Sequence, residues 1–154
     1  MPLVTRRVRR PQDKESLVRE IGGDDGKIFR HLRDVLRFAA VLGYARGRRE
    51  PFEQSAEAIP WEVFANGAGN EALVDLIGVA TTGTVEILSD ERFGERLTLF
   101  EEYANGGLAV LTEEIGQAGG KPRDVVLLLI LSAEDQVKDE SEIDLSGMID
   151  QILR

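Results

Sequence analysis

The sequence contains no cysteine, a single histidine and a single tryptophan among its 154 residues. The lack of cysteine excludes disulfide frameworks, thiolate metal sites and cysteine nucleophiles, and it suits a reducing compartment. Long apolar runs are also missing: the longest, residues 125–131, is far shorter than the roughly 20 residues that a membrane helix needs. A chain of this length can bury a core without a metal or a crosslink. We therefore expect a soluble, cytoplasmic protein with no cofactor and no membrane partner.

Charge is divided unevenly along the chain. The formal net charge is −9, yet residues 1–50 hold 13 Lys and Arg against 7 Asp and Glu, whereas residues 51–154 hold 6 against 21. Because long-range fields steer charged partners, this division indicates either two different binding faces or an internal electrostatic match between the halves. A third interpretation, in which both sets of charges are simply solvated, stays open.

The first third of the chain shows two helical segments behind a basic lead-in. Residues 6–11 should be extended, because proline disfavours helix at the residue before it, and no apolar segment follows that would make them part of a secretory signal. A first helix should begin with Asp13 as its N-cap and end at Gly22 and Gly23. The clearest helix runs from about residue 26 to residue 44, where apolar residues recur at helical spacing.

The middle of the chain is less regular. Residues 59–64 predict either a brief strand or an apolar hook over the core, and we favour the hook. Asn70 can cap a helix that ends at Thr82 and Gly83. Residues 85–88 should then be extended or irregular.

The second half carries one long apolar pattern. From Asp90 to Ile115 the apolar residues keep a single helical phase, which predicts one long helix with a weak point at Gly106 and Gly107. Residues 124–132 are apolar on every side, so periodicity does not separate helix from strand, and the helical neighbours favour helix. An acidic loop over 137–144 and a short helix over 145–153 should complete the chain.

These elements together predict a mainly α fold. We expect a compact single-domain bundle of about five or six helices with a short irregular or β-like hook. Residues 1–12 would form a basic N-terminal arm and residues 13–154 the helical domain.

Catalytic signatures are scarce. His31 has no nucleophile at helical spacing around it, so a structural role is favoured over acid–base chemistry. Asp25 and Lys27 resemble the end of a nuclease signature, but they open a helix where that chemistry needs a strand. Acidic pairs such as Glu101 and Glu102 are typical of a solvated helix face, and residues 67–70 fit a plain turn better than an anion site. We therefore expect no catalytic residue, no metal ligand and no enzymatic activity.

Arginine dominates the basic half and supplies the candidate binding residues. The candidates for binding nucleic acid or a partner are Arg6, Arg7, Arg9, Arg10, Lys27, Arg30, Arg33, Arg37, Arg46, Arg48 and Arg49. They should lie on the N-terminal arm, along the exposed ridge of the long helix and in the loop that follows it. Such cations could follow a phosphate backbone. Because arginine forks bind carboxylates equally well, an acidic protein patch is the alternative, and a purely solvated surface is the third.

Five short segments resemble a known family. They are RRVRRP at 6–11, RDVLRFAAVLGY at 33–44, GRREP at 47–51, ILSDE at 87–91 and FEEYANGGL at 100–108. In order and spacing they are similar to the Dnd-system-associated proteins, also called DNA phosphorothioation-associated proteins, over roughly residues 6–112. The resemblance implies a gene near bacterial or archaeal systems that replace a non-bridging phosphate oxygen of DNA with sulfur, or that restrict unmodified DNA. It implies no catalytic residue.

The resemblance and the composition together narrow the expected function. Sulfur carriers, desulfurases and iron–sulfur subunits need thiolates, so a cysteine-free chain is none of these. We expect an accessory or regulatory subunit of a DNA phosphorothioate modification or restriction system in phage defence, with the other subunits, DNA or both as partners. A small DNA-binding transcription regulator of such a locus is the alternative, and a nuclease subunit is a third reading. The oligomeric state stays open.

Overall fold

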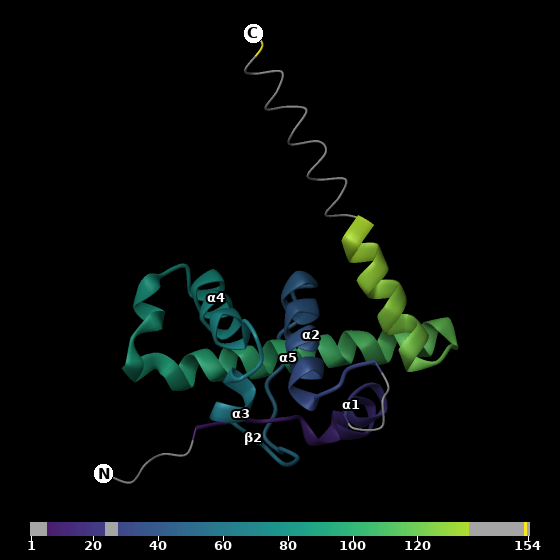
Figure 1. Ribbon diagram of the computed structural model, residues 1–154, viewed down its shortest axis with the longest axis horizontal. Helices are drawn as coiled ribbons and strands as arrows, with labels where there is room; N and C mark the ends of the chain where they lie inside the picture. The colour runs from purple at the N-terminus through teal and green to yellow at the C-terminus, as the bar shows by residue number, and fades with distance from the viewer. Residues whose placement is uncertain (1–5, 24–27, 136–152, 154) are drawn as a thin grey trace.

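The computed structural model of the chain describes residues 6–23, 28–135 and 153. Its longest helix, α5 (Phe93–Ala118), runs across the molecule and serves as the support for the other elements (Figure 1). Helix α2 (Leu32–Ala45) crosses α5 near its middle, and α4 (Asn70–Thr82) packs against α5 on the same side as α2. Helix α1 (Glu15–Ile21) packs against α2. The fold is therefore built on one central helix, and the predicted mainly α class is confirmed.

A small β element ties the start of the chain to its middle. Strand β1 (Arg7–Val8) pairs antiparallel with β2 (Ile59–Pro60). The chain passes from β2 directly into α3 (Trp61–Ala65). The expected hook is thus a two-residue strand followed by one short helix, and it holds the N-terminal segment against the bundle.

The core lies where α2 and α5 cross, and their backbones touch there. A Cβ on Gly107 would overlap the carbonyl oxygen of Ala39, and one on Gly43 would overlap that of Tyr103. Next to them, a Cβ on Gly106 would overlap the carbonyl oxygen of Arg48. The glycines that we expected to weaken the long helix are therefore the residues that let α2 approach it.

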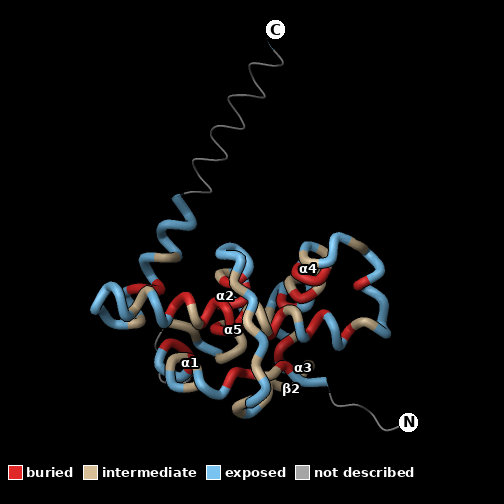
Figure 2. The backbone as a smooth tube through the Cα atoms, turned by 180° about the vertical axis from the view of Figure 1, so that it is seen from behind, coloured by how far each residue is buried: buried red, intermediate tan, exposed pale blue. Residues whose placement is uncertain are grey.

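Side chains close the core around this crossing. Buried residues of α2 and α5 meet there, and Figure 2 shows red segments on both helices. The buried apolar residues contributed by these two helices include Val35, Leu36, Ala39, Phe100, Ala104, Leu108 and Leu111. Phe64 of α3 joins them, with its ring centroid 5.1 Å from that of Phe100 in an edge-on arrangement.

The long-helix predictions in the second half are confirmed. Helix α5 is continuous through its glycines. Residues 122–135 are also helical, which decides the ambiguous apolar run in favour of helix. Helix α4 ends, as expected, at a left-handed Gly83. The acidic loop over 137–144 and nearly all of the final helix lie outside the described residues.

Two predicted helix starts are wrong. The long helix begins at Leu32 and not near residue 26, because the backbone N–H groups of Ile28 and Phe29 donate to the carbonyl of Ile21 and keep this stretch extended. Asp13 is not an N-cap: it lies in a 3₁₀ turn, η1 (Gln12–Lys14), that precedes α1. Tertiary hydrogen bonds therefore set the start of α2, and a local 3₁₀ turn sets the start of α1.

Two further local predictions also need correction. Asn70 is the first residue of α4, and its buried amide donates to the carbonyl of Phe64 at 2.9 Å and does not cap the helix. Residues predicted to be extended or irregular form a 3₁₀ helix, η2 (Val85–Leu88), whose first turn is capped by the hydroxyl of Thr84. A second 3₁₀ turn, η3 (Asp90–Arg92), leads into α5.

Candidate functional site

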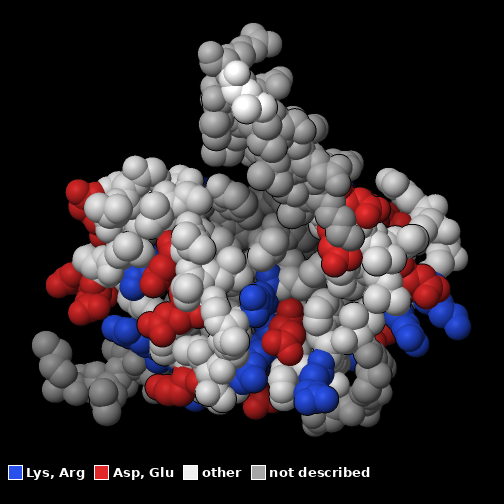
Figure 3. All heavy atoms as spheres, turned by 45° about the horizontal axis from the view of Figure 1, so that its top comes forward, with Lys and Arg blue, Asp and Glu red and all other residues white. Residues whose placement is uncertain are grey.

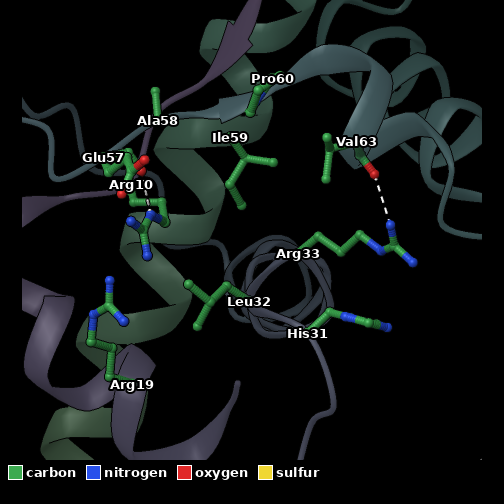
Figure 4. A pocket seen from close by; sticks show the side chains of 10 residues that line it. All are labelled: Arg10, Arg19, His31, Leu32, Arg33, Glu57, Ala58, Ile59, Pro60 and Val63. Carbon is green, nitrogen blue, oxygen red and sulfur yellow. Dashed lines mark hydrogen bonds between the residues drawn. The ribbon is translucent and has the colours of Figure 1, made fainter. Parts of the chain in front are cut away.

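Arginine side chains from three parts of the chain line one cavity of about 280 Å³ (Figure 4). We call it the arginine pocket and define it by Arg10, Arg19, His31 and Arg33. Arg10 follows β1, Arg19 belongs to α1, and His31 and Arg33 lie at the start of α2. Its remaining lining comes from Leu32, Glu57, Ala58, Ile59, Pro60 and Val63.

Arg10 forms the buried wall of the arginine pocket. Its side chain is 2% exposed, its Nε donates to the carbonyl of Glu57 at 2.6 Å, and its Nη1 lies 2.9 Å from Oε1 of Glu15. Its backbone is held as well, since its N–H donates to the Ser55 hydroxyl and its carbonyl accepts from Ala56. A guanidinium held at so many points keeps a fixed position, which preorganises its charge.

Three guanidinium groups and one carboxylate, that of Glu57, line the arginine pocket. The same Glu15 oxygen that faces Arg10 also accepts from Nε of Arg19 at 2.8 Å, so one carboxylate serves two guanidinium groups. Arg33 donates from Nη1 to the carbonyl of Val63 at 2.8 Å, and its buried Nε has no hydrogen-bond partner within the described part of the chain. Helix α2 also points its N-terminal dipole end toward this place. An anionic group is therefore the ligand that the pocket suits best.

Other predicted cations pair with the acidic half of the chain. Arg9 contacts Glu101, with 3.1 Å between its Nε and Oε1 of the carboxylate. Arg46 lies 3.1 Å from Glu114. These contacts support the internal electrostatic match, one of the readings left open by the division of charge.

Arg48 shows the same matching in the loop after α2. Its Nη2 lies 3.0 Å from Glu113 and 2.9 Å from Glu50. The hydrogen bonds that Arg48 donates to Glu113 raise the pKa of Arg48, and the same bonds lower the pKa of the Glu113 carboxyl. Both groups therefore stay charged over the ordinary pH range, and the loop is held against α5.

Glu101 differs from the solvated residue that its acidic neighbourhood predicted. Only 3% of it is exposed, and it accepts hydrogen bonds from the backbone N–H and the Nε of Arg9. Burial raises the pKa of its carboxyl, an effect that these bonds only partly offset. The solvated-face expectation is wrong for this residue because the N-terminal segment covers it.

The remaining candidates do not form one basic surface. Arg37 donates to the carbonyl of Ala68 at 2.8 Å, and Arg6 lies over the ring of Phe93 at 4.2 Å. Arg49 lies over the ring of Tyr103 at 5.9 Å. Arg7 and Arg30 are exposed, and both Lys27 and Asp25 lie outside the described residues. On the face shown in Figure 3, blue and red side chains are interleaved. That face therefore carries no continuous arginine ridge.

Sequence reasoning missed Arg19, Glu15 and Arg96. The first two were not singled out, because only the packing of α1 against the N-terminal segment brings them beside Arg10. Arg96 of α5 is 5% exposed, lies 3.0 Å from Asp75 and donates to the carbonyl of Ser89 at 2.8 Å. It fastens α4 and the loop before α5 to the central helix, a structural role.

The described residues contain neither a cluster of metal ligands nor a helix suited to a membrane. Within 6–23, 28–135 and 153, no three Asp, Glu or His side chains gather where they could hold a metal ion. None of the helices in these ranges has both the length and the apolar character needed to cross a membrane.

A protein-family model described as DNA sulphur modification system-associated protein 4 matches residues 7–148. This match confirms the resemblance to proteins of such systems and extends it beyond residue 112. No curated protein and no solved structure matches the chain.

Proposed function

Because the chain belongs to the family of DNA sulphur modification system-associated protein 4, we propose that it is a non-enzymatic accessory subunit of such a system that contacts the DNA phosphate backbone through the arginine pocket. The observation that carries this proposal is the gathering of Arg10, Arg19 and Arg33 around one cavity at the start of α2. Arginine forks bind phosphate oxygens bidentately, and a helix N-terminus favours the same charge. The other subunits of the system would be its protein partners.

The charge of the whole chain limits the kind of DNA contact. A net charge of −9 opposes long-range attraction to DNA, so the contact must be local and short in range. Each phosphate neutralised adds about 0.9 to the slope of log affinity against log salt. The arginine pocket accounts for two or three such contacts, and we expect a slope of about −2 to −3.

The alternative of a transcription regulator is less well supported. Helix α4 follows α3 after a short turn and would be the recognition helix of such a regulator. It carries Glu71 and Asp75 but no lysine or arginine. A recognition helix has to approach phosphates and base edges in the major groove, where these carboxylates are repelled.

The arginine pocket can be tested by titrating fluorescent duplex DNA at several salt concentrations. We expect the double variant Arg19→Gln with Arg33→Gln to bind more weakly and to reduce the salt slope by up to about 2. The matched control is Arg46→Gln with Arg92→Gln, which removes the same charge from two exposed arginines that pair with Glu114 and Glu95. The control should leave the slope unchanged. Thermal melts of all three proteins check that the fold is intact.

The titration also distinguishes the competing functions. Absence of wild-type binding at low salt would remove DNA from the proposal and leave an acidic segment of a partner subunit as the ligand of the pocket. If the pocket variant and the control variant bound DNA equally weakly, the affinity for DNA would depend only on the net charge of the chain. Strong preference for one duplex sequence would favour the regulator. Hydrolysis of DNA or nucleotides by the purified chain would contradict the non-enzymatic role.

A further inference from the structure

The helical segment 122–135 leaves the end of α5 after a turn at Gly119 and rises away from the bundle (Figure 1). Its inner side is anchored: Val126 is fully buried, and Leu129 packs against the core. Figure 2 shows the rest of the segment as mostly exposed. The two sides of this helix therefore have very different surroundings.

The outer side of the segment also carries large apolar residues. Leu127, Leu128 and Leu131 are 40%, 63% and 56% exposed. At this three- and four-residue spacing they form one stripe along the helix, which we call the leucine stripe. A helix that is apolar all round is normally covered on both sides. The leucine stripe thus requires an occupant.

The charges at the two ends of the segment identify that occupant. Lys121, Arg123 and Asp124 precede the leucine stripe with one net positive charge, and Glu134 and Asp135 follow it with two negative charges, all of them exposed. A matching partner needs an apolar centre, an acidic end opposite the basic one and a basic end opposite the acidic one. The same helix in antiparallel orientation has this pattern. We propose that two copies of the chain associate through their leucine stripes, with the two helical segments antiparallel.

The spacing of the charges sets the register. Arg123 and Glu134 lie on the same edge of the leucine stripe, and 11 residues of helix separate them by about 16 Å along the axis. A two-fold axis close to Leu128 brings Arg123 of each copy opposite Glu134 of the other and Lys121 opposite Asp135. A parallel pair would instead place Arg123 against Arg123. The charges therefore favour the antiparallel arrangement, and the contact is isologous, as in most homodimers.

Sedimentation of the full chain over a wide range of concentrations tests the association. We expect a reversible monomer–dimer equilibrium, which the double variant Leu128→Gln with Leu131→Gln should abolish. The matched control is Leu76→Gln on α4, a residue 65% exposed and remote from the leucine stripe. It should dimerise as the wild type does. A monomer at every concentration, or equal loss of dimer in the control, would overturn the proposal.

Charge reversal tests the orientation. Arg123→Glu and Glu134→Arg should each weaken dimerisation by roughly tenfold, since each reversal disturbs two symmetric pairs that are individually weak. The two changes combined restore opposite charges across the interface, so affinity should recover. Failure of the combined variant to recover, with each single variant folded by circular dichroism, would overturn the proposed register.

Disulfide crosslinking gives an independent answer, because the chain has no cysteine of its own. Under mild oxidation Leu128→Cys should form a covalent dimer, since the two Cα atoms near the two-fold axis come within the range of a disulfide. Arg123→Cys should not crosslink to itself, but a mixture of Arg123→Cys and Glu134→Cys proteins should. Efficient self-crosslinking of Arg123→Cys would show a parallel pair and overturn the proposal.

Discussion

Replacement of Gly107 by alanine probes the backbone contact at the centre of the fold. The added Cβ would overlap the carbonyl oxygen of Ala39 and lie 2.6 Å from its carbonyl carbon and 3.0 Å from its Cα. All three atoms belong to the backbone of α2, so no side-chain rotation relieves the contact. Helices α2 and α5 would have to separate by about 1 Å, which forfeits a quarter to a half of the attraction at each contact across the crossing.

The magnitude follows from two opposing effects. Overpacking a well-packed core costs about 1–3 kcal/mol and occasionally more, and a backbone clash belongs at the upper end of that range. Alanine also favours the helix by about 1 kcal/mol relative to glycine. We therefore expect Gly107→Ala to lower the free energy of unfolding by about 2 kcal/mol. With a urea dependence of about 1–3 kcal/mol per molar, the midpoint should fall by roughly 1 M.

Gly116 provides the matched control because it lies in the same helix but in open space. No atom lies within 4 Å of a Cβ built on it. Gly116→Ala should therefore leave stability unchanged or raise it by up to about 1 kcal/mol. Urea unfolding followed by circular dichroism measures both variants. If Gly107→Ala were as stable as the wild type, the close approach of α2 and α5 at this residue would be refuted.

Three further substitutions test the buried and paired polar groups. Burial raises the pKa of Glu101 in the folded state, so ionisation of this carboxyl lowers the stability of the wild type. The free energy of unfolding of Glu101→Gln should therefore rise relative to that of the wild type as pH rises above the ordinary carboxyl range. A difference in unfolding free energy that does not change with pH would contradict this. Glu113 behaves in the opposite sense because Arg48 lowers the pKa of its carboxyl. Glu113→Gln should be less stable than the wild type at neutral pH, and thermal melts should show the difference in melting temperature shrinking on acidification. Asn70→Ala removes one of the two hydrogen bonds that the carbonyl of Phe64 accepts, since the backbone N–H of Gly67 still donates to it, and should cost about 1 kcal/mol in urea unfolding, with an unchanged midpoint as the contrary result.

Several features of this protein could be predicted from the sequence because they depend on neighbours along the chain. Apolar periodicity predicted the long helix through residues 93–118, and the left-handed Gly83 was expected from its place after Thr82. The order and spacing of short segments indicated the family. Helix starts were predicted less well, because the first turn of a helix competes with other hydrogen bonds. The extended backbone before α2 shows this, since it bonds to Ile21 at the end of another helix.

Only the tertiary structure decided which arginines pair with carboxylates and which line the arginine pocket. Arg9 and Glu101 are 92 positions apart, and Arg10 shares Glu15 with Arg19 only because α1 folds back beside the N-terminal segment. In the sequence all these residues look like solvated surface charges, because periodicity reports the face of one helix and not what covers it. The role of Gly107 was hidden for the same reason: a glycine that weakens an isolated helix becomes the point of closest approach once a second helix crosses it.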